Sequence, residues 1–120
     1  MKAKFDYDCI VIGGGPAGLM AAIQSAAAGN RVAVLERNGV LCKKLRITGK
    51  GRCNLTNDCD FDSLMAGIPH NPKFLFSALK KFSNTDIISF FHELGLKTVT
   101  ERGGRVFPET QRAGDVAGAL

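Results

Sequence analysis

The apolar residues of the first third of the chain are arranged as two short strands on either side of a helix. Residues 9–12 form an apolar, partly β-branched run that predicts a buried parallel strand. An alanine-rich segment at 16–28 predicts a helix, and Gly29 is well placed to end it. The run at 31–35 predicts a second strand, so we expect a βαβ unit over residues 8–36.

Residues 37–70 show no sustained helical or strand period, although a short run at 44–48 fits a strand. A segment of this length with little regular structure is usually either functional or disordered. Gly39, Gly49 and Gly51 favour a loop that wraps around a ligand. We therefore expect a cofactor-wrapping loop here.

A pair of helices is predicted for residues 71–95. Asn71 and Pro72 form a good helix start, with a capping residue followed by proline in the first turn. The apolar residues of this helix line one face, at Leu75, Ala78, Leu79 and Phe82. Ser83 or Asn84 begins the second helix, and its predicted buried stripe consists of Ile87, Phe91 and Leu94.

The residues from 96 to 108 predict a hairpin, with strands at 97–101 and 106–107 around a glycine turn. A last helix begins near residue 110 and reaches Leu120 with no stop signal. Only two strands of a doubly wound sheet are recognised. We therefore expect the chain to be the N-terminal part of a larger protein.

The corner between the first strand and the helix is a glycine turn, which consists of Gly13, Gly14, Gly15, Pro16, Ala17 and Gly18. In a dinucleotide-binding unit the first glycine allows a sharp turn, the second lets the backbone approach a pyrophosphate, and the third lets the helix lie close to the sheet. Free amides and the helix dipole favour an anion at this corner. Glu36 follows Gly18 by 18 residues, where a carboxylate can bind the ribose hydroxyls. The alternative is a structural turn that binds nothing.

Charge is concentrated beside this unit, because residues 37–52 contain six basic residues and no acidic one. The remainder of the chain carries 10 basic and 11 acidic residues. The basic stretch contains no aromatic residue, so an anion such as a pyrophosphate explains it better than nucleic acid does. We expect no nucleic-acid partner.

Four cysteines show neither a CxxC pair nor a metal-ligand spacing, so we expect reduced thiols, no metal site and a cytoplasmic location. No apolar run approaches the roughly 20 residues that span a bilayer. Residues 1–4 resemble the start of a secretory signal, but the apolar stretch that follows is too short for one. We expect no membrane partner.

The glycine turn together with the segment TGKGRCNLTN at 48–57 resembles the BaiN/RdsA family of FAD-dependent oxidoreductases, which includes YhiN-type and aminoacetone oxidase-like proteins. A third stretch, GRVFP at 104–108, and the helix after it are also similar to this family. The resemblance covers nearly the whole chain. One departure is Lys50, where many members carry a third glycine.

This resemblance implies an α/β fold, namely a Rossmann-like FAD-binding domain of glutathione-reductase type that is incomplete here. The glycine turn would hold the pyrophosphate and Glu36 the ribose. Arg37 and Lys44 would lie near the adenosine and phosphates, and Arg52, Cys53 and Asn54 near the flavin. The implied cofactor-binding residues are Gly13, Gly14, Gly15, Pro16, Ala17, Gly18, Glu36, Arg37, Lys44, Gly51, Arg52, Cys53 and Asn54.

By resemblance, the protein is a flavoprotein oxidoreductase that exchanges electrons or a hydride with a small organic substrate, with NAD(P)H as a candidate electron donor. The alternatives are an NAD-dependent dehydrogenase, which Glu36 suits equally well, and a non-catalytic nucleotide-binding fragment. No acid–base pair or nucleophile relay is recognised, so catalytic residues, substrate and oligomeric state stay unassigned. Cys53 and Cys59 are too far apart for a tight redox pair. We expect the 120-residue chain alone to be inactive.

Overall fold

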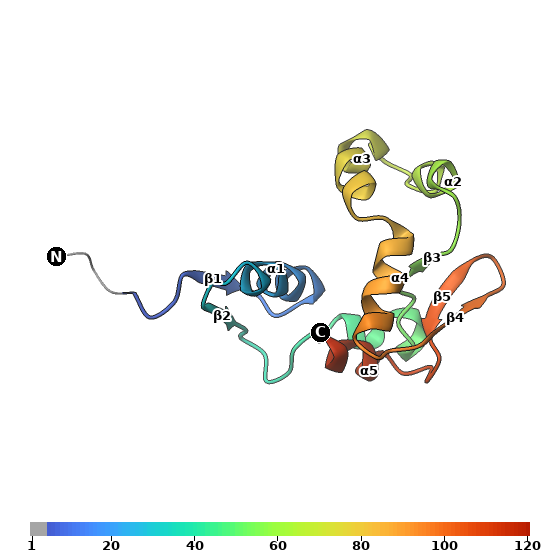
Figure 1. The fold of residues 1–120 in the computed structure, drawn as a ribbon. Coiled ribbons are helices and arrows are strands. Elements are labelled where there is room, and N and C mark those ends of the chain that lie inside the picture. Colours follow the sequence, from blue (N-terminus) through green and yellow to red (C-terminus); the bar gives the residue numbers. More distant parts are fainter. Residues whose placement is uncertain (1–4) are drawn as a thin grey trace.

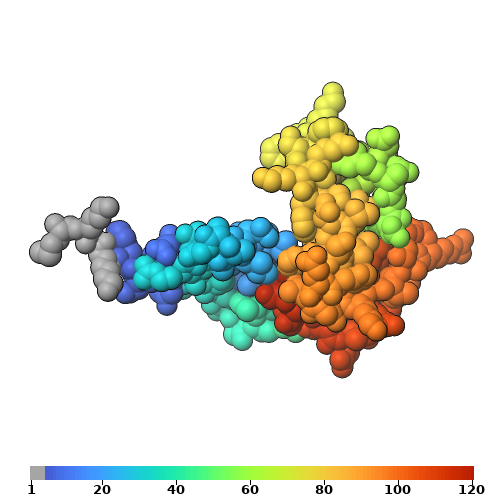
Figure 2. Space-filling model, viewed as in Figure 1, coloured from blue at the N-terminus to red at the C-terminus, as the bar shows by residue number. Residues whose placement is uncertain are grey.

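The computed structural model describes residues 5–120, so the expectation about a signal at residues 1–4 lies outside the described part. The molecule is elongated, with principal extents of 58 × 31 × 26 Å. A βαβ unit forms one end, and the other end combines a small antiparallel sheet with four helices (Figure 1). Figure 2 shows the βαβ unit as a narrow extension beside the bulkier remainder of the chain.

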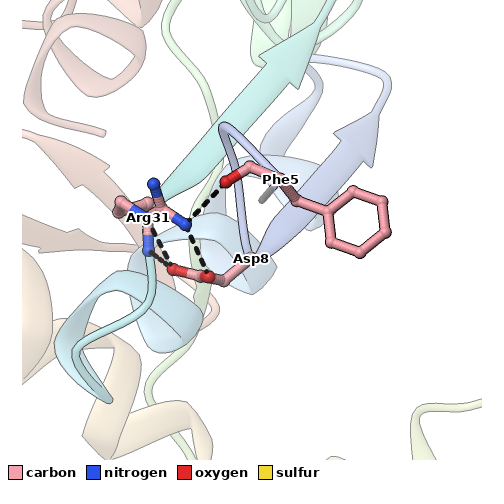
Figure 3. A network of polar contacts seen from close by, with 3 residues as sticks. All are labelled: Phe5, Asp8 and Arg31. Carbon is pink, nitrogen blue, oxygen red and sulfur yellow. Dashed lines mark hydrogen bonds and ion pairs between the residues drawn. The ribbon is translucent and has the colours of Figure 1, made fainter. Parts of the chain in front are cut away.

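The βαβ unit predicted from the sequence is confirmed. Strand β1 (Cys9–Ile12) pairs in parallel with β2 (Val32–Leu35), and helix α1 (Pro16–Ala27) connects them. The residues that directly precede the two strands are joined by an ion pair, in which Arg31 Nη2 lies 3.0 Å from Asp8 Oδ1 (Figure 3). The same nitrogen donates to the Phe5 carbonyl at 2.9 Å, so the guanidinium ties both chain segments together.

The two-stranded sheet is covered on one face only. Helix α1 packs on that face through Leu19 and Ala22, which are buried. Because side chains alternate along a strand, Ile10 and Ile12 lie on the opposite face, together with Leu35. All three are exposed, Ile12 to 87%. Within residues 5–120, this apolar face has no covering layer.

The segment after β2 contains more regular structure than the sequence predicts. The strand expected at 44–48 is wrong, because a 3₁₀ segment, η1 (Leu45–Gly51), begins there. Local hydrogen bonds replace strand pairing: Arg46 N–H donates to the Cys42 carbonyl at 3.1 Å, and Ile47 N–H donates to the Lys44 carbonyl at 3.2 Å. Strand β3 (Thr56–Asn57) and helix α2 (Phe61–Ala66) follow.

The predicted helix pair is present as α3 (Pro72–Lys81) and α4 (Asn84–Glu93). Ser83 caps α4 in a capping box with Asp86. The expected side-chain cap at Asn71 is wrong, because that residue is left-handed and makes no cap hydrogen bond. The apolar face expected for α3 is largely exposed, and no α3 residue is buried.

The hairpin is confirmed. Strands β4 (Thr98–Glu101) and β5 (Arg105–Pro108) pair antiparallel, and β3 adds to the other edge of β5 to give the order β3-β5-β4. Helix α5 (Ala113–Ala119) then packs on η1 and β5. The main core is formed by Cys53, Phe91, Leu96, Ala113 and Val116. No helix among residues 5–120 is long and apolar enough to cross a membrane.

Candidate functional site

A cavity of about 610 Å³ lies where the start of α1 meets the larger part of the molecule. Its walls come from the glycine turn and α1, from the segment 44–55, and from α4 and α5. The lining residues are Gly15, Pro16, Ala17, Met20, Lys44, Leu45, Thr48, Cys53, Asn54, Leu55, Ile87, Phe91, Val116 and Leu120. Segments far apart in the sequence therefore meet at the start of α1.

Two glycines of the turn are required by the fold itself. Gly13 has a φ of +105°, a backbone conformation that only glycine adopts without strain. A Cβ on Gly18 would overlap the Gly13 carbonyl oxygen and approach Val11 Cγ1 at 3.3 Å. These two positions let α1 start close to the end of β1, as the sequence analysis expects.

Gly15 is different, because the fold itself would accept a side chain there. Its φ is −82° and its ψ is 177°, an extended conformation open to any residue. Apart from its two neighbours in the chain, no residue of the described chain has a heavy atom within 4 Å of a Cβ at this position. Gly15 lines the cavity and is the N-cap of α1, which has no side-chain cap and begins with Pro16. The missing side chain therefore leaves free space at amides that can receive an anion.

Glu36 lies against the glycine turn. Its Oε2 accepts from the Gly14 amide at 2.8 Å, and its Oε1 accepts from the Asn38 amide at 2.8 Å and from Asn38 Nδ2 at 2.6 Å. Two backbone hydrogen bonds lower the pKa of the Glu36 carboxyl below its usual value. The larger effect comes from the Asn38 amide and the next largest from the Gly14 amide. The carboxylate is therefore ionised at neutral pH and is held at the turn.

Cys42 fixes the chain over this turn, a role that its sequence context does not predict. Its amide donates to the Gly14 carbonyl at 2.8 Å, and its side chain is buried with Leu19 and Ala117. Burial raises the pKa of the Cys42 thiol. A lone cysteine after a strand carries no sequence signal that would distinguish this contact from ordinary core packing.

The segment 48–54 forms another wall of the cavity through a sharply folded backbone. Lys50 and Cys53 have φ values of 57° and 60°, which are uncommon for residues other than glycine. Lys50 is thus a left-handed residue at the position where the family resemblance expects glycine. The Cys53 amide donates to the Thr48 carbonyl at 3.0 Å.

The Cys53 side chain is only 4% exposed, and burial raises the pKa of its thiol. It is therefore a protonated thiol at neutral pH rather than a ready nucleophile. All four cysteines, Cys53 and Cys59 included, are free thiols. Within residues 5–120, no group of three or more His, Cys, Asp or Glu residues is arranged to hold a metal ion.

Arg52 is not among the residues that line the cavity. Its Nη1 donates to Glu101 Oε1 and to Gln111 Oε1, both at 2.9 Å. Its guanidinium carbon lies 4.0 Å from the centre of the Phe107 ring. Arg52 is therefore engaged with the hairpin and with the residues that precede α5.

The structure brings six of the expected cofactor-binding residues to the cavity wall, namely Gly15, Pro16, Ala17, Lys44, Cys53 and Asn54. Gly13, Gly14 and Gly18 belong to the turn beside the cavity, and Glu36 is hydrogen-bonded to this turn. The remaining three expected residues, Arg37, Gly51 and Arg52, do not line the cavity either. Ile87 and Phe91 also line the cavity, although the sequence predicts them only as core residues. An apolar stripe on a helix does not distinguish a core contact from a cavity wall.

The parallel βαβ unit and the cavity at its glycine turn define a Rossmann-type α/β domain. Residues 7–120 match the HI0933-like protein Rossmann domain, and the chain belongs to this family. The match confirms the family resemblance and the fold class inferred from the motifs.

Three curated relatives are similar over most of the chain. The 3-dehydro-bile acid delta(4,6)-reductase of Clostridium scindens is 39% identical over 108 residues, which cover 88% of this chain and 26% of the relative. The ribosomal RNA dihydrouridine synthase of Escherichia coli is 32% identical over 84% of this chain and 25% of its own length. The enzyme of the same name from Haemophilus influenzae is 35% identical over 82% of this chain and 24% of its own length. The chain thus spans about a quarter of the length of these relatives.

Proposed function

We propose that the protein in its full natural length is an FAD-dependent oxidoreductase, and that the glycine turn of this chain holds the pyrophosphate of the cofactor. The observation that carries the proposal is the open space at Gly15, since packing within residues 5–120 does not require a glycine there. This space lies on the cavity wall at the uncapped start of α1, where an anion is favoured.

The residues around this space fit the cofactor. We assign the pyrophosphate to Gly13–Gly18 and the ribose to Glu36, whose ionised carboxylate can accept hydrogen bonds from hydroxyls. Lys44, on the cavity wall, supplies a positive charge for the phosphates. Cys53 and Asn54 lie on the same wall, and we assign them to the flavin side.

When bound, FAD supplies the transfer of electrons or a hydride to or from an organic substrate. Leu45, Ile87 and Phe91 make part of the cavity wall apolar. The names of the relatives contain two different substrates, a 3-dehydro-bile acid and ribosomal RNA. These names share no substrate class, so we propose only an organic substrate for this protein. NAD(P)H is a candidate electron donor, and we propose a cytoplasmic location.

Cofactor extraction from the purified full-length protein tests this proposal. The expected result is a yellow protein that releases FAD on denaturation, identified by chromatography against FAD, FMN and NAD standards. Release of NAD instead would favour the dehydrogenase alternative, for which Glu36 is equally suited. A colourless protein that FAD does not reconstitute would contradict the proposal and favour a non-catalytic role.

A further inference from the structure

Arg52 joins three segments that are distant in the sequence. It belongs to the segment that forms a cavity wall, and its two hydrogen-bond acceptors, Glu101 and Gln111, lie in β4 and just before α5. The Arg52 and Glu101 side chains are 33% and 29% exposed, so this ion pair is partly shielded from solvent. Such a pair is less screened by salt than a fully exposed one.

The backbone around Arg52 needs support from outside. Lys50, Cys53 and Gln111 are all left-handed residues other than glycine, and such conformations persist only where the surrounding structure holds them. Lys50 and Cys53 are in the same segment as Arg52, and the Gln111 side chain accepts a hydrogen bond from Arg52. The guanidinium therefore connects the strained residues on both sides.

Phe107 provides the surface on which this segment rests. Its ring is 2% exposed and lies below the Arg52 guanidinium. A Cβ on Gly49 would lie 3.2 Å from Phe107 Cε1 and 2.8 Å from the Asn54 amide nitrogen, so the folded segment is pressed against the ring. Next in the chain, the Leu55 amide donates to the Val106 carbonyl at 2.8 Å.

We propose that Arg52 is a positioning residue, which holds the cavity wall at Cys53 and Asn54 through Glu101, Gln111 and Phe107 and does not touch the cofactor. The tests of this inference that measure FAD binding or the flavin potential rest on the proposed function. The motif resemblance alone implies a position near the flavin. In the structure, however, the guanidinium is engaged with Glu101 and Gln111, and Arg52 is not a lining residue.

A double-mutant cycle tests the inference, with Arg52→Gln, Glu101→Gln and the double variant made in the full-length protein. The first readout needs no cofactor: hydrogen exchange of the Cys53 and Leu55 amides in the apoprotein. If the two side chains act as one unit, each single variant speeds exchange by about tenfold and the double variant by no more. Arg105→Gln, which removes an exposed arginine of the same hairpin, is the matched control and should leave this exchange unchanged.

The second readout is the bound cofactor. Each single variant should weaken FAD binding by about tenfold, and the double variant by a similar factor, because both remove the same support. Arg52→Lys should not restore affinity, since the lysine lacks the planar group that stacks on Phe107. The reduction potential of the bound flavin should stay unchanged.

Additive effects, unchanged exchange, restored affinity in Arg52→Lys or a shifted potential would each overturn the inference. If the double variant does not fold, Arg52→Gln combined with Gln111→Ala, which removes only a neutral acceptor, takes its place in the cycle. If the wild-type protein binds no FAD, the proposed function fails, while the exchange measurement still decides the role of Arg52.

Discussion

Single residues decide how closely α1 approaches the sheet, and Gly18 is the position with the least room. Gly18→Ala places a methyl group against the Gly13 carbonyl oxygen, so the helix must shift away from β1. We expect a loss of about 1–3 kcal/mol in the free energy of unfolding, the usual range for overpacking. Denaturant unfolding of the variant measures this loss.

Gly67→Ala is the matched control for Gly18→Ala, because a Cβ there would meet its neighbours only at 3.4 Å and beyond. It should change stability much less. Equal stability of the Gly18→Ala variant and the wild type would show that α1 is not held this close to β1.

The Asp8–Arg31 pair gives the stability a dependence on pH. The hydrogen bond from Arg31 lowers the pKa of the Asp8 carboxyl from its usual 3.8 to about 2. Because the folded pKa lies below the unfolded one, the pair stabilises the protein above about pH 3.8, and this contribution is lost as the pH falls toward 2. Asp8→Asn should therefore lower the melting temperature at pH 7, and its effect should shrink as the pH falls through about 2.

The pair is exposed, so the effect should be small and should weaken with added salt. Asp6→Asn, which changes another exposed carboxylate two residues earlier, is the control. A difference between Asp8→Asn and the wild type that persists unchanged down to pH 2 would rule out the ion pair as its source.

At the scale of elements, helix caps fix where the chain changes direction. The Ser83 Oγ accepts from the Asp86 amide at 3.2 Å, and the Ser83 amide donates to Asp86 Oδ2 at 2.7 Å. Ser83→Ala removes the first of these bonds and should destabilise the protein by about 1 kcal/mol. Ser89→Ala, at an exposed position inside the same helix, should cause no loss. Equal stability of the two variants would contradict the cap.

The elements that the sequence predicts correctly are those with local signals. The βαβ unit has its apolar runs and glycines, α4 has its Ser83 cap, and the hairpin has a glycine turn between two strands. The 3₁₀ segment was not predicted because it packs against α5 and Phe107, which lie far away in the sequence.

In the candidate site, too, features with a local sequence signal are predictable and features set by distant contacts are not. The glycine turn and Glu36 can be placed from spacing alone, and their mutual contact agrees with that placement. The direction of the Arg52 side chain cannot be predicted in this way, because its partners Glu101 and Gln111 are 49 and 59 residues away.

At the scale of the whole molecule, large apolar surfaces stay open. Ile10, Ile12 and Leu35 form the uncovered sheet face, and Phe74 on α3 is 80% exposed. Apolar surfaces of this kind mark places where other protein segments pack. We therefore expect weak or absent FAD binding by the 120-residue chain alone.

The central claim is that the space at Gly15 is occupied by the pyrophosphate of FAD, and affinity is its most direct test. FAD titration, followed by flavin fluorescence, compares the full-length wild type with Gly15→Ala and with Gly118→Ala. Both substitutions add a methyl group where no neighbour lies within 4 Å, but only Gly15 lines the cavity. We predict that Gly15→Ala weakens FAD binding by at least about tenfold, or about 1.4 kcal/mol, while Gly118→Ala binds FAD like the wild type. Equal affinity of all three proteins for FAD would contradict the claim.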